Sequence, residues 1–128
     1  MEHMEKSKVY FTSFKTSFTE NIPAKLKRLI LTAGIGDIDF TDKYAAVKIH
    51  FGELGNLAFL RPNYAKTVVS AIQELGGKVF LTDCNTLYVG SRKNALDHLD
   101  TAYENGFSPF STGCHVIIGD GLKGTDEA

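Results

Sequence analysis

The sequence lacks an excess of either charge, because its 14 lysine and arginine residues are matched by 15 aspartate and glutamate residues. The main basic cluster, residues 25–28, is too small for the extended basic surface of a nucleic-acid-binding protein. No apolar run approaches the roughly 18 residues that span a bilayer, and no basic segment with an apolar core opens the chain. We therefore expect neither nucleic-acid nor membrane binding, and we interpret the chain as cytoplasmic.

Cysteine is also scarce. Cys84 and Cys114 are too far apart for a C-x-x-C redox or zinc motif, and two thiols cannot form a disulfide framework. Burial as small hydrophobic side chains is the favoured interpretation of both. Cys84 has no neighbouring histidine in the sequence that would point to a nucleophilic role.

The remaining composition is that of a globular protein, with 43% hydrophobic and 23% charged residues in 128 positions. This length predicts one domain, residues 8–128, preceded by a leader, residues 1–7, which is interpreted as partly vector-derived. No helix is predicted after the last strand. This pattern indicates a domain truncated from a longer protein, which would self-associate through an uncovered sheet edge.

Apolar periodicity and breaker residues predict strands alternating with helices. Strands are expected at residues 9–14, 44–51, 78–83 and 115–119. Helices are expected at residues 22–34, from Pro62 to Gly76, and from a Ser91 cap to Gly106. The third helix should bury Ala95, Leu96, Leu99, Ala102 and Tyr103 and expose Arg92, Lys93, Asp97, Asp100 and Glu104.

This alternation predicts an α/β fold with right-handed crossovers. We expect a three-layer β-α-β-α-β-α-β arrangement, in which a mostly parallel sheet carries helices on both faces. Ligands of such sheets bind beyond the carboxyl ends of the strands. The polar residues expected at that edge are Ser13, Lys15, Lys48, His50, Glu53, Asp83, Asn85, Tyr88 and Asp120.

The second strand gives the strongest signal, because period-two alternation places Lys48 and His50 on one face. A buried Lys48 would need a carboxylate, an anionic ligand or water, whereas at a sheet edge it would simply point to solvent. His50 could be structural or could transfer a proton, with Asp83 as an orienting carboxylate. The weak candidates for metal ligands are His50, Asp83 and Asp120.

Two loops add candidate ligand-binding residues. The first, residues 52–61, contains Gly52, Glu53, Asn56 and Arg61 and is longer than most βα loops. Its backbone amides could hold an anion or could form a mere turn, and it matches no known phosphate-loop motif. In the second, residues 82–92, Asp83 and Asn85 could serve a ligand or form Asx turns, beside Tyr88 and Arg92.

Several motifs carry a family resemblance: VKIHFGELGN at residues 47–56, LRPN at 60–63, LTDCNTLYVGSRKN at 81–94 and GF at 106–107. They resemble a family of uncharacterised iron–sulfur cluster-binding proteins, domain of unknown function family 362. The likeness extends over nearly the whole chain, from Lys8 to Glu127. It implies further α/β structure and a ferredoxin module with a 4Fe–4S cluster in the full-length protein. Since a cluster takes four ligands, normally thiolates, no cofactor is expected in this chain.

Three functional hypotheses follow. In the first, the chain is the ligand-binding portion of an iron–sulfur, electron-transfer protein, which would be part of an oxidoreductase. A small anionic ligand would contact Lys48 and Arg61, lined by Lys15, Gly52, Glu53, Asn56, Asn85, Tyr88 and Arg92. In the second, the strand-end crevice is a non-catalytic docking module. In the third, His50, Asp83 and Asp120 serve a metal-dependent hydrolase.

Overall fold

The computed structural model describes residues 6–126, so most of the expected leader, residues 1–7, lies outside the described residues. The first helix, α1, spans Ile22–Thr32. Asn21 caps it, because its side-chain oxygen accepts a hydrogen bond from the Ala24 amide at 2.9 Å. Pro23 stands in the first turn, and Gly34 turns the chain away with a φ of 99° into a short 3-10 helix, Ile35–Asp37. The predicted helix is confirmed and ends two residues early.

The sheet has three parallel strands, β1 (Tyr44–Lys48), β2 (Lys78–Asp83) and β3 (His115–Ile118), in the order β1-β2-β3. Val47 lies beside Leu81, and Leu81 lies beside Val116. The predicted α/β class with a parallel sheet is therefore confirmed. The first of these strands ends earlier than expected, so that His50 and Phe51 lie just beyond it.

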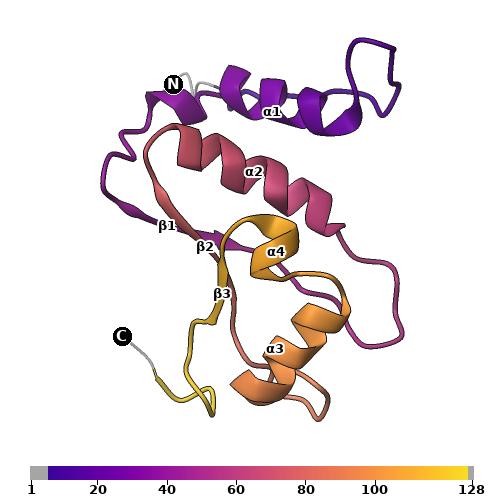
Figure 1. The fold of residues 1–128 in the computed structure, drawn as a ribbon, viewed down its shortest axis with the longest axis vertical. Coiled ribbons are helices and arrows are strands. Elements are labelled where there is room, and N and C mark those ends of the chain that lie inside the picture. The colour runs from indigo at the N-terminus through magenta and orange to yellow at the C-terminus, as the bar shows by residue number, and fades with distance from the viewer. Residues whose placement is uncertain (1–5, 127–128) are drawn as a thin grey trace, which may run out of the picture.

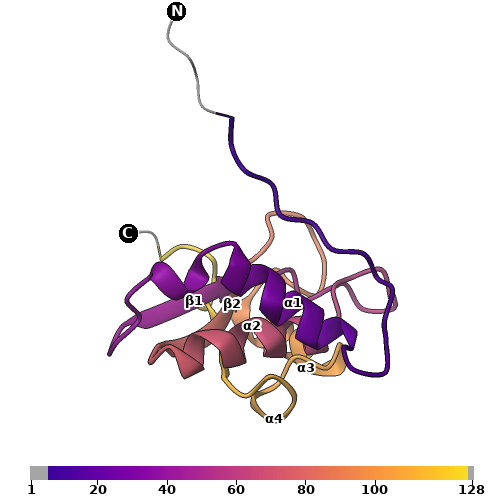
Figure 2. The same ribbon diagram turned by 90° about the horizontal axis from the view of Figure 1, so that it is seen from above.

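The crossovers contain α2 (Pro62–Glu74), α3 (Ala95–Glu104) and a four-residue helix, α4 (Pro109–Thr112). Strands in sequential order joined by right-handed crossovers place all their helices on one face. Figures 1 and 2 show this arrangement, with α2, α3 and α4 on the same side of the strands and α1 beside α2. The expected second layer of helices is not found in residues 6–126. On the other face Tyr44 is 80% exposed and Ile117 is 48% exposed.

The core lies between the sheet and these helices. Phe51, Leu81, Val69 and Phe107 are fully buried, and the Phe51 and Phe107 rings meet edge to face at 5.3 Å. Phe51 follows β1 and Phe107 follows α3, so this contact fixes where both segments leave the core. The carboxyl ends of β1 and β2 are therefore anchored next to α3.

Residues 9–14 form no strand, contrary to the prediction. They are extended but unpaired, and the carbonyl oxygens of Ser13 and Lys15 accept hydrogen bonds from the buried Lys25 ammonium at 2.8 and 2.6 Å. β-forming side chains do not make a strand without a partner to pair with. The segment is instead held against α1 through Lys25.

The third helix begins later than predicted, at Ala95 after an Asn94 cap, because the Asn94 side chain accepts hydrogen bonds from the Leu96 and Asp97 amides. Ser91 is thus not the cap. The predicted buried face is also partly wrong, since Leu96 and Tyr103 are exposed. The helix instead buries His98 and Thr101 beside the predicted Ala95 and Ala102.

Helix α4 is an unpredicted element between α3 and β3. Its capping box joins the side chains and backbone amides of Ser108 and Ser111. No helix within residues 6–126 is long and apolar enough to cross a membrane.

Candidate functional site

A cluster of charged and polar side chains lies where the strands end. It draws on the loop after β1, the loop after β2 and one face of α3, which the sheet topology brings to a single edge. In parallel sheets this edge is the usual place for ligands. The cluster therefore forms where the sequence predicted a site.

Asp83, the last residue of β2, is the centre of this cluster and is only 7% exposed. Its Oδ1 accepts a hydrogen bond from the Cys84 amide at 2.9 Å and lies 3.4 Å from Lys48 Nζ. Its Oδ2 lies 3.6 Å from Arg92 Nη1 and 3.7 Å from His98 Nε2. Two positive charges and an imidazole thus surround one buried carboxylate, which offsets the cost of its burial.

Lys48 resolves the alternatives raised by its position in the sequence. It lies on an edge strand and its side chain is 68% exposed, yet its ammonium reaches the buried Asp83. An ammonium has three donors. Asp83 therefore fixes where the Lys48 charge lies while much of the side chain faces solvent.

Arg92, Glu53 and Tyr88 form a second layer of the cluster. Arg92 is 3% exposed, and its Nε donates to Glu53 Oε1 at 2.8 Å, while its Nη2 contacts both Glu53 Oε1 and the Tyr88 hydroxyl. The Tyr88 hydroxyl also donates to Glu53 Oε1 at 2.7 Å. These bonds hold the loop after β1 against the loop after β2. The outward position predicted for Arg92 is wrong, because the residue precedes α3 and turns toward Glu53 and Asp83.

The same hydrogen bonds shift the pKa values of Glu53 and Tyr88. Hydrogen bonds from Arg92 and Tyr88 lower the pKa of Glu53. The bond to the Glu53 carboxylate raises the pKa of the Tyr88 hydroxyl. Glu53 is therefore held ionised and Tyr88 is held protonated, as a positioning pair rather than as groups that titrate near neutrality.

His50 is exposed, and its Nδ1 accepts a hydrogen bond from the Gly52 amide at 3.0 Å. This bond places the proton of the neutral ring on Nε2. No ion pair or hydrogen bond joins His50 to Asp83 within residues 6–126. The structure thus brings Lys48 to Asp83, while His50 stands next to this pair along the chain without touching it.

Asn85 and Asp120 join two loops of the cluster through hydrogen bonds. The Asn85 backbone amide donates to both carboxylate oxygens of Asp120, at 2.9 and 3.0 Å, and its side-chain amide donates to Asp120 and to the Gly121 carbonyl. This pair ties the loops after β2 and β3 together. In the described part of the chain no three histidine, cysteine, aspartate or glutamate side chains are placed to hold a metal, and His50, Asp83 and Asp120 form no such group.

The predicted anion loop, residues 52–61, is folded mainly by local contacts. Gly52 is buried with a φ of 86°, and a Cβ there would lie 2.6 Å from the Phe59 ring and 2.7 Å from Asn105 Nδ2, so only glycine fits. Asn56 accepts a hydrogen bond from the Ala58 amide at 2.8 Å, in an Asx turn. Arg61 is exposed at the start of α2, and Lys15 lies in the N-terminal segment.

His98 is the functional candidate that the sequence prediction missed. It is 0% exposed, its ring meets Phe51 edge to face at 5.7 Å, and neither ring nitrogen has a hydrogen-bond partner. Burial lowers its pKa, although the nearby Asp83 carboxylate opposes this effect. Its spacing three residues after Ala95 and four before Ala102 is the helical signal that could have found it.

The comparisons with known proteins give one match. Residues 45–128 match the family described as Domain of unknown function (DUF362). The chain belongs to the DUF362 family. Among curated proteins and solved structures nothing matches significantly. The match includes β1 and both loops of the cluster, so the strand-end cluster is built within the DUF362 region.

The thiols of this DUF362 chain do not fit an iron–sulfur cluster. The whole sequence contains two cysteines, whereas a 4Fe–4S cluster takes four ligands, normally thiolates. Cys84 is exposed at the strand end, but Cys114 is buried, and burial raises the pKa of its thiol. The burial and raised pKa of Cys114 favour a structural role for this residue. Two thiols are too few to hold the cluster.

Proposed function

We propose that this DUF362 chain binds a small anionic molecule at the carboxyl edge of its sheet. The observation that carries the proposal is the Lys48–Asp83 pair, in which a buried carboxylate holds an exposed ammonium 3.4 Å away. The other cation of the cluster, Arg92, is buried and already paired with Glu53. Lys48 is therefore the charge of this cluster that can meet a ligand.

In this proposal Lys48 binds the anionic group and His50 moves a proton. The Gly52 amide donates to His50 Nδ1, so the proton of the neutral ring is on Nε2, and Nε2–H is the group left to donate to a ligand. Asp83 acts as a positioning residue, because it touches Lys48 and lies beneath the surface. Arg61 at the start of α2 is a further cation for the same anion.

Titration of the ¹⁵N-labelled chain with orthophosphate and with acetate tests the proposal. We expect saturable amide shifts at residues 48–53 and 83–86, with a Kd on the order of 1 mM, which is about 4 kcal/mol of binding free energy. Lys48→Met should weaken binding about tenfold and His50→Ala several-fold. Lys66→Met, at an exposed lysine on α2, is the matched control and should bind like the wild type. Unsaturable shifts, or equal loss in the control, would refute the site.

We also propose that the chain serves a ferredoxin-linked redox protein, in which the cluster is bound by other residues. The support is the resemblance of its motifs to iron–sulfur cluster-binding proteins, and the two cysteines of the chain leave the cluster ligands to other residues. The full-length protein should purify brown with a reducible visible absorption, whereas this chain should be colourless. A colourless full-length protein after anaerobic cluster reconstitution would contradict this link.

Docking is the second candidate function, and apolar loop tips at the same edge favour it. Leu87 is 100% exposed, Leu57 is 88% exposed and Val89 is 87% exposed. Such a group of uncovered side chains suits a protein partner or a second copy of the chain. Light scattering at high concentration tests self-association: we expect a dimer or larger assembly that Leu87→Ser and Val89→Ser weaken. A monomer throughout the concentration series would refute self-association.

A further inference from the structure

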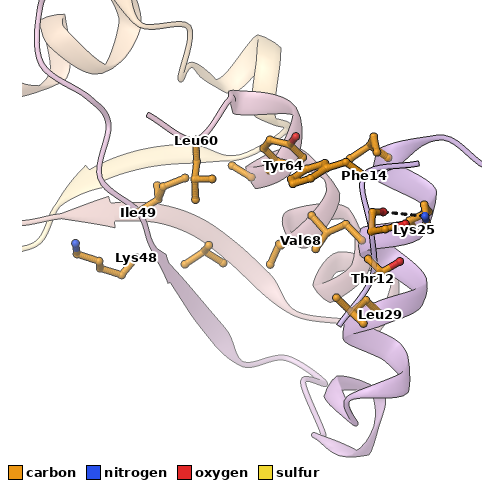
Figure 3. A pocket seen from close by; sticks show the side chains of 14 residues that line it. Thr12, Phe14, Lys25, Leu29, Lys48, Ile49, Leu60, Tyr64 and Val68 are labelled. Atoms are coloured by element: carbon orange, nitrogen blue, oxygen red, sulfur yellow. Dashed lines mark hydrogen bonds between the residues drawn. The ribbon is translucent and has the colours of Figure 1, made fainter. Parts of the chain in front are cut away.

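An apolar cavity of about 440 Å³ lies beside the outer edge of β1. Its walls come from the N-terminal segment, α1, β1 and α2, as Figure 3 shows. This volume lies within the range of roughly 300–1,000 Å³ that is usual for small-molecule pockets. The cavity adjoins the proposed anion site through Lys48, which lines it.

The lining is apolar and carries no carboxylate. Leu29, Val47, Ile49 and Val68 supply much of its aliphatic surface, and the charged lining residues are Lys25 and Lys48. The Lys25 ammonium is bonded to the carbonyl oxygens of the N-terminal segment. Of the two ammonium groups, Lys48 is therefore the one that can bind a ligand, and the cavity complements an apolar molecule with one anionic end.

The geometry also connects the cavity with the strand end. In Figure 3 the Lys48 side chain extends from β1 away from α1, at the opposite side of the cavity from Lys25. An elongated ligand that lies in the cavity along the edge strand β1 would have its charged end at Lys48.

We propose that the DUF362 chain binds an anionic amphiphile, with its alkyl chain in this cavity and its carboxylate on Lys48. This inference rests on the proposed function and names its ligand class. Each buried methylene contributes about 0.8 kcal/mol, so each added carbon should tighten binding by about fourfold until the cavity is full.

Displacement of the fluorescent fatty-acid analogue 11-(dansylamino)undecanoate tests the proposal, and the chain has no tryptophan to add background emission. Hexanoate, octanoate and decanoate, all below their micellar concentrations, should compete with increasing affinity. Decanol and decyltrimethylammonium should compete at least tenfold more weakly than decanoate. Equal competition by all three ten-carbon compounds would overturn the anionic part of the proposal.

Variants locate the bound chain. Val68→Trp should fill the cavity and abolish decanoate binding, and Lys48→Met should weaken it about tenfold. Phe110→Ala, at an exposed apolar side chain outside the cavity, is the control and should bind normally. Should Val68→Trp lose its far-ultraviolet circular dichroism, Phe14→Ser replaces it, since Phe14 lines the cavity but is 78% exposed and is not needed for folding of the core.

The outcomes separate this inference from the proposed function. If acetate and decanoate bind at Lys48 with equal affinity, the anion site stands and the cavity proposal fails. If the fluorescent probe binds but Lys48→Met has no effect, both assignments of Lys48 fail. Residues 9–14 could occupy the cavity in place of a ligand, by pairing with β1 as a fourth strand. Strong amide protection of these residues without ligand uptake would also overturn the proposal.

Discussion

Replacing Asp83 by asparagine removes one charge from the centre of the strand-end cluster with little change in shape. The asparagine oxygen can still accept the hydrogen bond that the Cys84 amide now donates to Oδ1. Its amino group, however, takes the place of Oδ2 and faces the donors of Arg92, 3.6 Å from the present oxygen. The substitution therefore leaves a buried guanidinium beside a new donor.

The expected loss of stability follows from the burial of the two partners. Breaking a buried ion pair by removing one partner costs about 3–5 kcal/mol. Arg92 keeps its bonds to Glu53, and Lys48 is exposed enough for water to replace its partner, so the loss should lie near the lower limit. We expect a decrease of about 3 kcal/mol in the free energy of unfolding, equivalent to roughly 10 °C in Tm for a domain of this size.

Urea unfolding followed by far-ultraviolet circular dichroism measures this change, with the m-value as a check that the unfolded state is unaltered. A double-mutant cycle with Lys48→Met then separates the contribution of Lys48 from that of Arg92 to the lost free energy of unfolding. Because Lys48 is largely exposed, its coupling to Asp83 should be at most about 1 kcal/mol. A loss below about 1 kcal/mol in Asp83→Asn, or a coupling to Lys48 that accounts for all of it, would refute a buried Arg92–Asp83 pair as the main contribution.

Three further predictions concern single positions. The lowered pKa of Glu53 stabilises the fold above the ordinary glutamate pKa of about 4.3, and this stability is lost as the pH falls through the folded-state pKa. Glu53→Gln should therefore flatten the curve of unfolding free energy against pH below about pH 5. An unchanged slope would contradict this. Because the pKa of His98 is lowered in the folded state, the wild type loses stability as the pH falls below about 6.5. His98→Phe should remove this loss in unfolding experiments between pH 7 and pH 5. An unaltered pH profile would refute the prediction. Gly52→Ala should destabilise the chain by about 2 kcal/mol or more through its positive φ and its clash with Phe59, and a Tm within 2 °C of wild type would contradict this.

The sequence predicted most of the sheet because its core strands carry their own signals. The alternation of apolar side chains and the Gly76–Gly77 break gave β2 with its observed bounds, Lys78–Asp83. Residues 9–14 carry the same β-forming composition but have no pairing partner in the structure. A strand forms only beside a neighbouring strand, which composition does not reveal. The sequence likewise did not show which face of the sheet the helices cover, so helices were predicted on both faces.

At the site, the sequence predicted that Lys48 and Asp83 lie close together but not what the other candidate residues contact. Strand ends of a parallel sheet meet at one edge, so Lys48 and Asp83 could be paired in advance. The assignment of Arg92 to the outer face failed because it assumed a helix capped by Ser91, three residues before the true Asn94 cap. His98 was missed for another reason: it lies three residues after Ala95 and four before Ala102, but histidine does not count as apolar in the periodic pattern from which the buried face was predicted.

The division between buried and exposed cations explains how the cluster could be rigid and still bind a ligand. Arg92, Glu53 and Tyr88 join the loops after β1 and β2 through hydrogen bonds that a ligand need not break. Rigid supporting residues allow a neighbouring group to be held in one orientation. In the described part of the chain, the ion-pair partner of Lys48 is Asp83, 3.4 Å away. Asp83→Asn should therefore weaken anion binding through Lys48 as well as stability, whereas a substitution in the Arg92 layer should act on stability first.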